Sequence, residues 1–257
     1  MRAFGRAGEG PGEFASPTSV VVDGSSVAVL DPGLNRITWL ESEEGSPAFR
    51  LDAVERIAFE SVVTDFALTA GGNFLVTGFM PDSRLARLGR DGAGHEYVGP
   101  SPRVDGLTPN RRAEVFQGTL RASPARDRHV LTSRFASRID IVDAATGEHA
   151  TVWGPARFQP RSGDYETRFG YIDSAPTADG FFALYSGRTR EDHPGSANYA
   201  ATIHEFGWDG TLRAVYELDA DVIAIAWSGK DALLYGARHD PVPAIVVYEL
   251  DGTDAMD

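Results

Sequence analysis

The sequence contains no cysteine and only one lysine, Lys230, among its 24 basic residues. Without cysteine there can be no disulfide, no thiolate metal site and no cysteine nucleophile. All the other basic residues are arginines, whose planar guanidinium groups bind carboxylates through paired hydrogen bonds. Long apolar runs are missing too. No segment approaches the ~20 apolar residues that a membrane-spanning helix needs, so we expect no membrane span.

Positive charge is scarce relative to negative charge. The 37 acidic residues give the chain a formal net charge of -13. Because nucleic acid binding depends on Lys and Arg side chains that neutralise phosphates, we expect no nucleic acid partner. The opening residues, MRAFGRAGEG, lack the apolar core of a signal peptide, so none is expected within this sequence.

Helical periodicity and catalytic signatures are nearly absent. Residues 50–60 (RLDAVERIAFE) are the only stretch that could form a turn or two of helix, and a strand followed by a loop fits them equally well. There is no H-E-x-x-H zinc motif and no G-x-S-x-G nucleophile elbow. These absences favour an all-β protein and indicate no particular reaction.

What the sequence does contain is a repeat. Five segments read as apolar strand, turn and apolar strand, and each continues into a third strand. Four of them continue into a fourth. Antiparallel four-stranded units that recur every 40 to 50 residues or so are typical of β-propeller blades. The five segments are residues 19–31, 65–78, 119–133, 173–186 and 222–236.

The fifth unit has no fourth strand of its own. Natural β proteins avoid unpaired sheet edges, so we expect residues 1–6 to pair alongside residues 244–250 and close the ring. The Gly-rich stretch 8–14 (GEGPGEF) would then connect this closing strand to the first innermost strand. We therefore predict a single domain, residues 1–257, that forms a propeller of five four-stranded blades. Six blades are the alternative, but the connections 99–116 and 154–168 are too short to hold another blade.

A family resemblance strengthens this prediction. The N-terminal region, residues 4–40, resembles the blade junctions of bacterial TolB-like and NHL-type propeller proteins. The resemblance implies a six-bladed ring and an exported protein, located in the periplasm or outside the cell. The matching residues are Phe4, Gly5, Arg6, Gly10, Pro11, Gly12, Glu13, Phe14, Val27, Val29, Asp31, Asn35, Arg36 and Ile37.

Two aspartates are the candidate catalytic residues. Aligning the innermost strands on their turns places Ser19, Asp65, Thr119, Asp173 and Ile223 at the same depth near the mouth of the central channel. Facing carboxylates there could bind a divalent cation, bind a basic ligand, or act as an acid and base pair. Alternatively, each carboxylate accepts hydrogen bonds from backbone amides of the neighbouring blade.

Three long polar connections, residues 98–116, 154–169 and 187–199, are expected to gather at the channel mouth. Long loops in a compact domain are usually functional, and arginines with an aromatic ring suit an anionic or sugar-like ligand. His193 and His239 lie in equivalent loops beside Asp192 and Asp240, which makes a metal or acid-base site there a weaker alternative. The candidate ligand contacts in these loops are Arg111, Arg112, Tyr165, Arg168, Arg190, Asp192 and His193.

Two functions fit these features. The first is a non-enzymatic binding scaffold, expected to be monomeric, for a small molecule, glycan, peptide or protein. The second is a hydrolase or lyase acting on a sugar-like or lactone-like substrate through Asp65 and Asp173. No cofactor is expected for the scaffold, whereas the enzyme could use a divalent cation. The fold alone does not separate these functions, because propellers support both.

Overall fold

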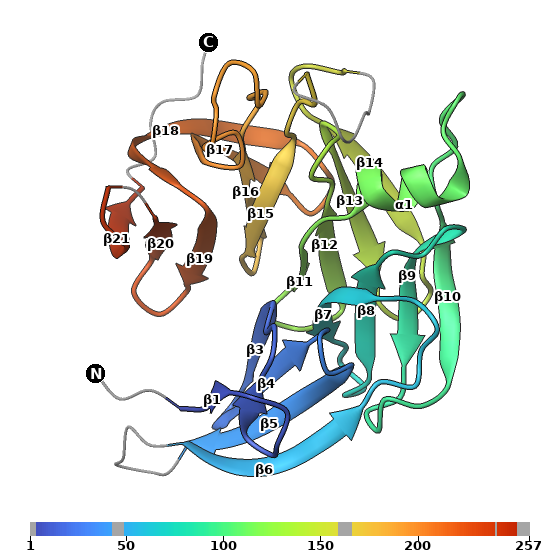
Figure 1. The fold of residues 1–257 in the computed structure, drawn as a ribbon. Coiled ribbons are helices and arrows are strands. Elements are labelled where there is room, and N and C mark those ends of the chain that lie inside the picture. Colours follow the sequence, from blue (N-terminus) through green and yellow to red (C-terminus); the bar gives the residue numbers. More distant parts are fainter. Residues whose placement is uncertain (1–3, 43–48, 159–165, 240, 251–257) are drawn as a thin grey trace.

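The computed structural model describes residues 4–42, 49–158, 166–239 and 241–250, and these form a β-propeller of five antiparallel blades (Figure 1). Blade 1 contains β3 (Ser19–Asp23), β4 (Ser26–Asp31), β5 (Arg36–Ser42) and β6 (Phe49–Arg56). Blade 2 contains β7 (Val63–Leu68), β8 (Phe74–Gly78), β9 (Ser83–Leu88) and β10 (His95–Pro100). Blade 3 contains β11 (Leu120–Ala122), β12 (Arg128–Thr132), β13 (Arg138–Asp143) and β14 (His149–Trp153).

Blade 4 contains β15 (Tyr171–Pro176), β16 (Gly180–Tyr185), β17 (Ala200–Gly207) and β18 (Leu212–Val222). Blade 5 contains β19 (Ala224–Ser228), β20 (Leu233–Arg238) and β21 (Ala244–Glu249). The innermost strands follow one another around the axis, so that β3 contacts β7, β7 contacts β11, β11 contacts β15 and β15 contacts β19. The predicted all-β fold and the prediction of five blades are confirmed.

The hydrophobic core is divided among the blade interfaces, because most strands send alternate side chains to opposite faces. On β8, for example, Val76 packs toward blade 1 whereas Leu75 packs toward blade 3. Trp39 and Phe74 stack across the first interface, with ring centroids 6.2 Å apart. Strands buried on both faces carry apolar residues at consecutive positions, which is why β8 (FLVTG) lacks the apolar-polar alternation of a half-exposed strand.

The described residues contain one helix, α1 (Pro109–Phe116), in the connection between blades 2 and 3. Sequence periodicity missed it. Residues 50–60, for which a turn of helix and a strand with a loop fitted equally well, form the strand β6 up to Arg56 and then a loop. The local signal for α1 lies in its first turn: Thr108 caps the helix by accepting a hydrogen bond from the Arg111 N–H, and Pro109 follows it. Among the described residues, no helix has the length and hydropathy needed to cross a membrane.

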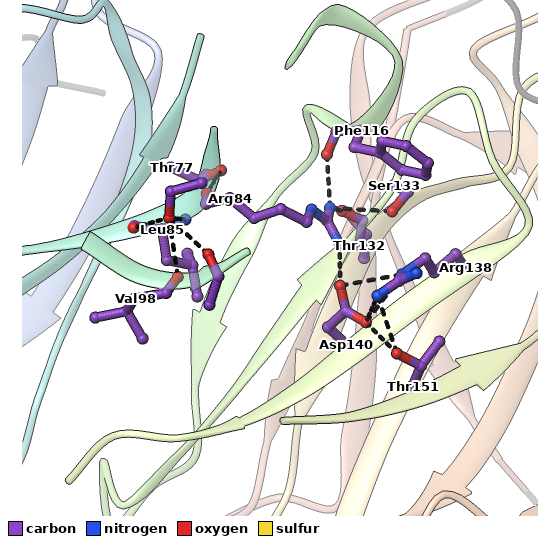
Figure 2. Close-up of polar contacts among 12 residues, drawn as sticks. Thr77, Arg84, Leu85, Val98, Phe116, Thr132, Ser133, Arg138, Asp140 and Thr151 are labelled. Carbon is purple, nitrogen blue, oxygen red and sulfur yellow. Dashed lines mark hydrogen bonds and ion pairs between the residues drawn. The ribbon is translucent and has the colours of Figure 1, made fainter. Parts of the chain in front are cut away.

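A buried ion pair joins blades 2 and 3 (Figure 2). Arg84 on β9 contacts Asp140 on β13, and both side chains are almost fully buried. The Arg84 guanidinium also donates to the carbonyl oxygens of Phe116 and Thr132, and Asp140 accepts a hydrogen bond from Thr151. Since an unpaired charge at this depth would be strongly destabilising, these partners are what allow the two groups to be buried.

The predicted closure of the ring by residues 1–6 is wrong for the residues that the structure describes. Strand β1 (Arg6–Ala7) pairs in parallel with β2 (Glu13–Phe14) instead of with β21. Residues 1–3 lie outside the described part of the chain. The fifth blade therefore has three strands in the described residues, and β19 makes no contact with β3 comparable to those between the other innermost strands.

The N-terminal segment folds back on itself because its sequence favours a tight local loop. Gly5, Gly8 and Gly12 all have positive φ, a conformation that glycine adopts without strain. Arg6 pairs with Glu13 at 2.6 Å. The Arg36 guanidinium then donates to the carbonyl oxygens of residues 9, 10 and 13, which fastens this loop to blade 1.

This N-terminal loop covers the face of blade 1 that is turned away from blade 2. Arg36, Thr38 and Leu40 share that face, opposite Trp39, and they are buried. Val20 and Val22 on the innermost strand remain open there, at 60% and 64% exposure, and so does Val54 on β6. The segment predicted to close the ring thus serves as a cap on blade 1.

Replacing Arg36 with leucine should release this cap. The variant loses three charge-assisted hydrogen bonds, each of a kind worth about 1.5–3 kcal/mol. We expect trypsin to cut after Arg6 at least tenfold faster than in the wild type, as followed by mass spectrometry of the N-terminal fragment. Arg50→Leu, which changes an exposed arginine on β6, is the matched control. Equal cleavage rates in R36L and R50L would contradict the assignment.

His204 should make the stability depend on pH. It is buried, its Nδ1 lies 2.8 Å from the Tyr171 hydroxyl, and burial lowers its pKa to about 4. As the pH falls below about 6.5, the unfolded chain binds a proton that the native state excludes, so the free energy of unfolding should fall by up to roughly 3 kcal/mol by pH 4.

Urea unfolding of His204→Gln between pH 4 and 8 tests this, because glutamine stays neutral and can still bond to Tyr171. The variant should lack this part of the pH dependence. His95→Gln, which changes an exposed histidine on β10, should keep it. Parallel pH profiles for the wild type and H204Q would rule out His204 as the source.

Candidate functional site

The two candidate catalytic aspartates are joined by an arginine from the blade between them. Asp65 lies on β7, Asp173 on β15 and Arg121 on β11, all innermost strands. Arg121 Nη1 lies 2.8 Å from an Asp65 oxygen, and Nη2 lies 3.0 Å from Asp173 Oδ1 as an ion pair without hydrogen-bond geometry. Both carboxylates are nearly inaccessible to solvent.

Each carboxylate also accepts a backbone N–H from the following blade. Leu120 N–H donates to Asp65 and Ile225 N–H donates to Asp173, both at 2.9 Å. Asp65 further accepts the hydroxyl of Ser19 on blade 1. A continuous chain of polar contacts, which we call the inner belt, therefore runs through Ser19, Asp65, Arg121, Asp173 and the Ile225 N–H, with one member from each blade.

The inner belt holds two carboxylates and one guanidinium at its centre. Burial raises the pKa of Asp173, and Arg121 and the Ile225 N–H oppose this only in part. Burial lowers the pKa of Arg121, but Asp173 and Asp65 together outweigh it and raise that pKa above its usual value. An acid and base role for the two aspartates stays a prediction. This geometry does not favour it, because protein groups already occupy the carboxylates.

We call the end of the propeller that carries residues 101–119, 133–137 and 187–199 the upper face. An open pocket lined by two arginines and two phenylalanines lies on this face. Its volume is about 380 Å³. The pocket lies at the junction of blades 3 and 4, where the β12–β13 and β16–β17 connections meet. Its lining residues are Arg134, Phe135, Phe169, Arg190, Pro194, Gly195, Ala197 and Asn198.

Two arginines and two phenylalanines give this pocket its chemistry. Phe135 and Phe169 pack edge to face with centroids 4.9 Å apart, and Arg190 lies over the Phe169 ring at 5.7 Å. Loss of water and the positive charge of Arg190 lower the pKa of Arg134, although its side chain keeps access to solvent. In the described part of the chain, neither arginine has a carboxylate within ion-pair distance.

Of the ligand contacts predicted from the sequence, the structure brings only Arg190 into this pocket. Arg111 pairs with Glu114 on the surface of α1, and Arg112 lies 3.9 Å from Asp82. The other predicted residues hold the loops together.

Arg168 donates to the carbonyl of Gly187, Asp192 accepts the hydroxyl of Thr189, and the His193 N–H donates to the Thr189 carbonyl. Tyr165 lies outside the described residues. These contacts account for the local loop structure and leave the ligand roles of these residues as predictions.

The sequence reading overlooked Arg121 and Arg134. Arg121 follows Thr119 by two positions and so lies on the same side of the innermost strand, which strand alternation could have indicated. Arg134 lies in the β12–β13 connection, a loop of the type already assigned to the functional face. Loop length could not have singled out Arg134, because the β12–β13 connection is short. The fold brings Arg134 and Arg190 to the same pocket.

No group of three or more His, Asp or Glu side chains within the described ranges is arranged to hold a metal ion. The ring of His239 lies 6.1 Å from the ring of Tyr199, and Asp240 falls outside the described residues. The divalent cation stays an untested expectation.

Comparison with known proteins supports the propeller fold. A family model described as TolB-like 6-blade propeller-like matches residues 1–229. No curated protein matches the sequence.

Several solved structures share the fold at low identity. Hydrazine synthase of Kuenenia stuttgartiensis superposes with a TM-score of 0.54 and 12% identity, covering 94% of this chain and 59% of that one. A Bacteroides fragilis protein gives 0.57 and 13%, covering 91% and 69%. The Pan2 WD40 domain of Neurospora crassa gives 0.50 and 12%, covering 86% and 61%. At these identities the likeness concerns the fold alone, and this chain spans less than two thirds of the hydrazine synthase chain.

Replacing Arg121 with methionine should destabilise the protein by about 3–5 kcal/mol at pH 7, because two buried carboxylates lose their shared cation. The loss should shrink as the pH falls toward 4, since protonation removes the uncompensated charge. Denaturant unfolding at both pH values measures this. Adding Asp173→Asn to R121M should restore part of the stability. A loss under 1 kcal/mol that does not change with pH would show that the inner belt is not held by charge.

Proposed function

The chain belongs to the TolB-like 6-blade propeller-like family, and we propose that it is a non-enzymatic binding scaffold that receives an acidic ligand on its upper face. The pocket formed by Arg134, Arg190, Phe135 and Phe169 is the proposed site. The observation that carries the proposal is the pair of arginines that face one pocket without a carboxylate partner in the described residues.

The burial and the contacts of Asp65 and Asp173 favour a binding function over a catalytic one. A general acid or base must be able to reach the proton it transfers, whereas Asp65 and Asp173 face Arg121 and backbone N–H groups. Their oxygens are buried and support the ring. A hydrolase or lyase reaction through these carboxylates would require the inner belt to break in every cycle.

The arginine pair suits a carboxylate or another oxyanion. Two guanidinium groups close enough for one to lower the pKa of the other repel each other, and an anion placed between them would relieve that repulsion. The chain is strongly acidic overall, so this local positive charge is also the feature that would select an acidic ligand from neutral ones.

The phenylalanines define the other half of the ligand. Phe135 and Phe169 are each less than 10% exposed and both line the pocket. An apolar or aromatic group next to the acidic group would pack against them. We therefore propose a ligand in which an acidic group adjoins an apolar one, either as a free organic acid or as the end of an acidic peptide.

Thermal unfolding with matched probes tests this proposal. Phenylacetate carries both groups, acetate carries only the acid and benzyl alcohol only the ring, while a peptide ending in Asp-Phe represents the peptide source. At 100 times its dissociation constant, a bound probe adds about 2.7 kcal/mol, or roughly 5–10 °C in Tm. We expect phenylacetate or the peptide to exceed both partial probes, and the stronger of the two identifies the source.

The arginines provide the control. Arg134→Gln and Arg190→Gln should each weaken binding at least tenfold, and Arg50→Gln on β6 should leave it unchanged. The same probe affinity in the R134Q/R190Q double variant would reject the site. Turnover of a sugar or lactone that is lost in both Asp65→Asn and Asp173→Asn, with folding intact, would replace the scaffold function with an enzymatic one.

A further inference from the structure

Within the described residues, blade 5 ends on β21 without an outer partner strand. In blades 1 to 4 the third strand is followed by an antiparallel fourth strand, namely β6, β10, β14 or β18. Strand β21 pairs with β20 on one side, and no strand in the described residues occupies its other side. In every other blade a fourth strand covers the outer edge of the third strand. In blade 5, the outer edge of β21 has no such partner among the described residues, so its backbone N–H and C=O groups are free there.

The side chains around this edge are unusually apolar for a surface. Ile245 is 68% exposed and Val247 is 52% exposed, and they share a face with Tyr235 and Ala226. This is the face turned away from blade 4, because Ile225, Leu234 and Val246 on the opposite face join the core between blades 4 and 5. A contiguous exposed patch of this kind marks an interaction site.

Strand β21 also lacks the protection found on neighbouring outer strands. Exposed edges are normally guarded by charged side chains, and β6 (FRLDAVER) and β18 (LRAVYELDADV) each carry several. In β21 (AIVVYE) the single charge is Glu249 at the end. The sequence of β21 is thus suited to pairing with another strand.

We propose that β21 receives an antiparallel β-strand from a partner protein, and that this strand alternates apolar with basic residues. The free backbone groups require an extended segment, because only a strand satisfies them in register. The fourth strands of the other blades define the pattern: Ala53, Val98, Val152 and Leu218 each point from a fourth strand into an interface core. The partner strand would place its apolar side chains in the same way.

Within the described residues, the innermost strands of blades 5 and 1 lack the contacts that join the other neighbouring blades. The chain belongs to a family described as six-bladed, whereas the described residues form five blades. Figure 1 shows blades 1 and 5 standing on either side of the opening in the ring. On blade 1 the N-terminal loop is fastened beside the open face by Arg36, whereas on blade 5 no described segment lies against the face that carries Ile245 and Val247.

Charge favours a basic partner over a second copy of this chain. Each copy carries a net charge of -13, and Asp219 and Glu249 lie beside or within the exposed edge. Pairing two copies would bring like charges together, while Arg or Lys on the incoming strand would face these carboxylates.

A synthetic peptide, RVTVRVK, tests the proposal on the whole chain in 0.15 M salt. We expect saturable binding by calorimetry and new protection of the Ala244–Glu249 amides in hydrogen exchange. A peptide with the same sequence but an N-methyl group on every residue after the first has no backbone N–H left on either edge to pair in register, so it should bind at least tenfold more weakly. The acidic peptide EVTVEVE should also bind at least tenfold more weakly.

Two protein variants locate the contact. Val247→Arg places a charge on the exposed edge and should weaken binding at least tenfold, whereas Val54→Arg, at an outward position on β6, should not. Both changes are at the surface, and circular dichroism checks that each variant folds.

Three results would overturn the proposal. The first is equal binding of the N-methylated peptide, and the second is protection that appears outside β21 or a loss of binding in V54R. The third is a dimer at micromolar concentration with β21 amides protected before any peptide is added, which would make a second copy the occupant. None of these readouts involves Arg134 or Arg190, so the upper-face pocket is tested separately.

Discussion

The inner belt is the interaction on which the rest of the structure depends. Ser19, Asp65, Arg121, Asp173 and the Ile225 N–H link the innermost strands of all five blades around the axis. Apolar packing between blades is nondirectional and would tolerate small rotations of one blade against the next. Buried charges that must each find a specific partner do not, because an unpaired carboxylate or guanidinium at this depth is costly. The belt therefore fixes the angular relation of the blades.

That constraint has a consequence for function. In the described residues the oxygens of Asp65 and Asp173 contact Arg121, a serine hydroxyl and backbone N–H groups, so the carboxylates that the sequence suggests as catalytic candidates also take part in contacts between blades. Arg134 and Arg190, which have no carboxylate partner among the described residues, lie farther out on the upper face and line a pocket together with Phe135 and Phe169. Polar groups at the axis hold the scaffold, and the proposed ligand site lies between two blades.

Blades 1 and 5, which flank the opening in the described ring, differ in how their free faces are covered. Blade 1 is covered by its own N-terminal loop, which three hydrogen bonds from Arg36 hold in place. Blade 5 has no such cover, and Ile245 and Val247 face solvent. Glycines that permit positive φ make the first arrangement local and independent of blade 5, so capping one end does nothing to protect the other. The proposed strand addition follows from this asymmetry.

The sequence by itself determined the fold class, the number of blades and the strand pattern, because these follow from the local alternation of apolar and turn-forming residues. It also led to Asp65, Asp173 and Arg190 as residues of interest. What these side chains contact depends on the tertiary structure. Arg121 comes between the two aspartates, Arg134 comes beside Arg190, and residues 6–14 pair with each other instead of with β21. These outcomes depend on contacts between segments tens of residues apart and on competition between alternative pairings, which no local pattern encodes.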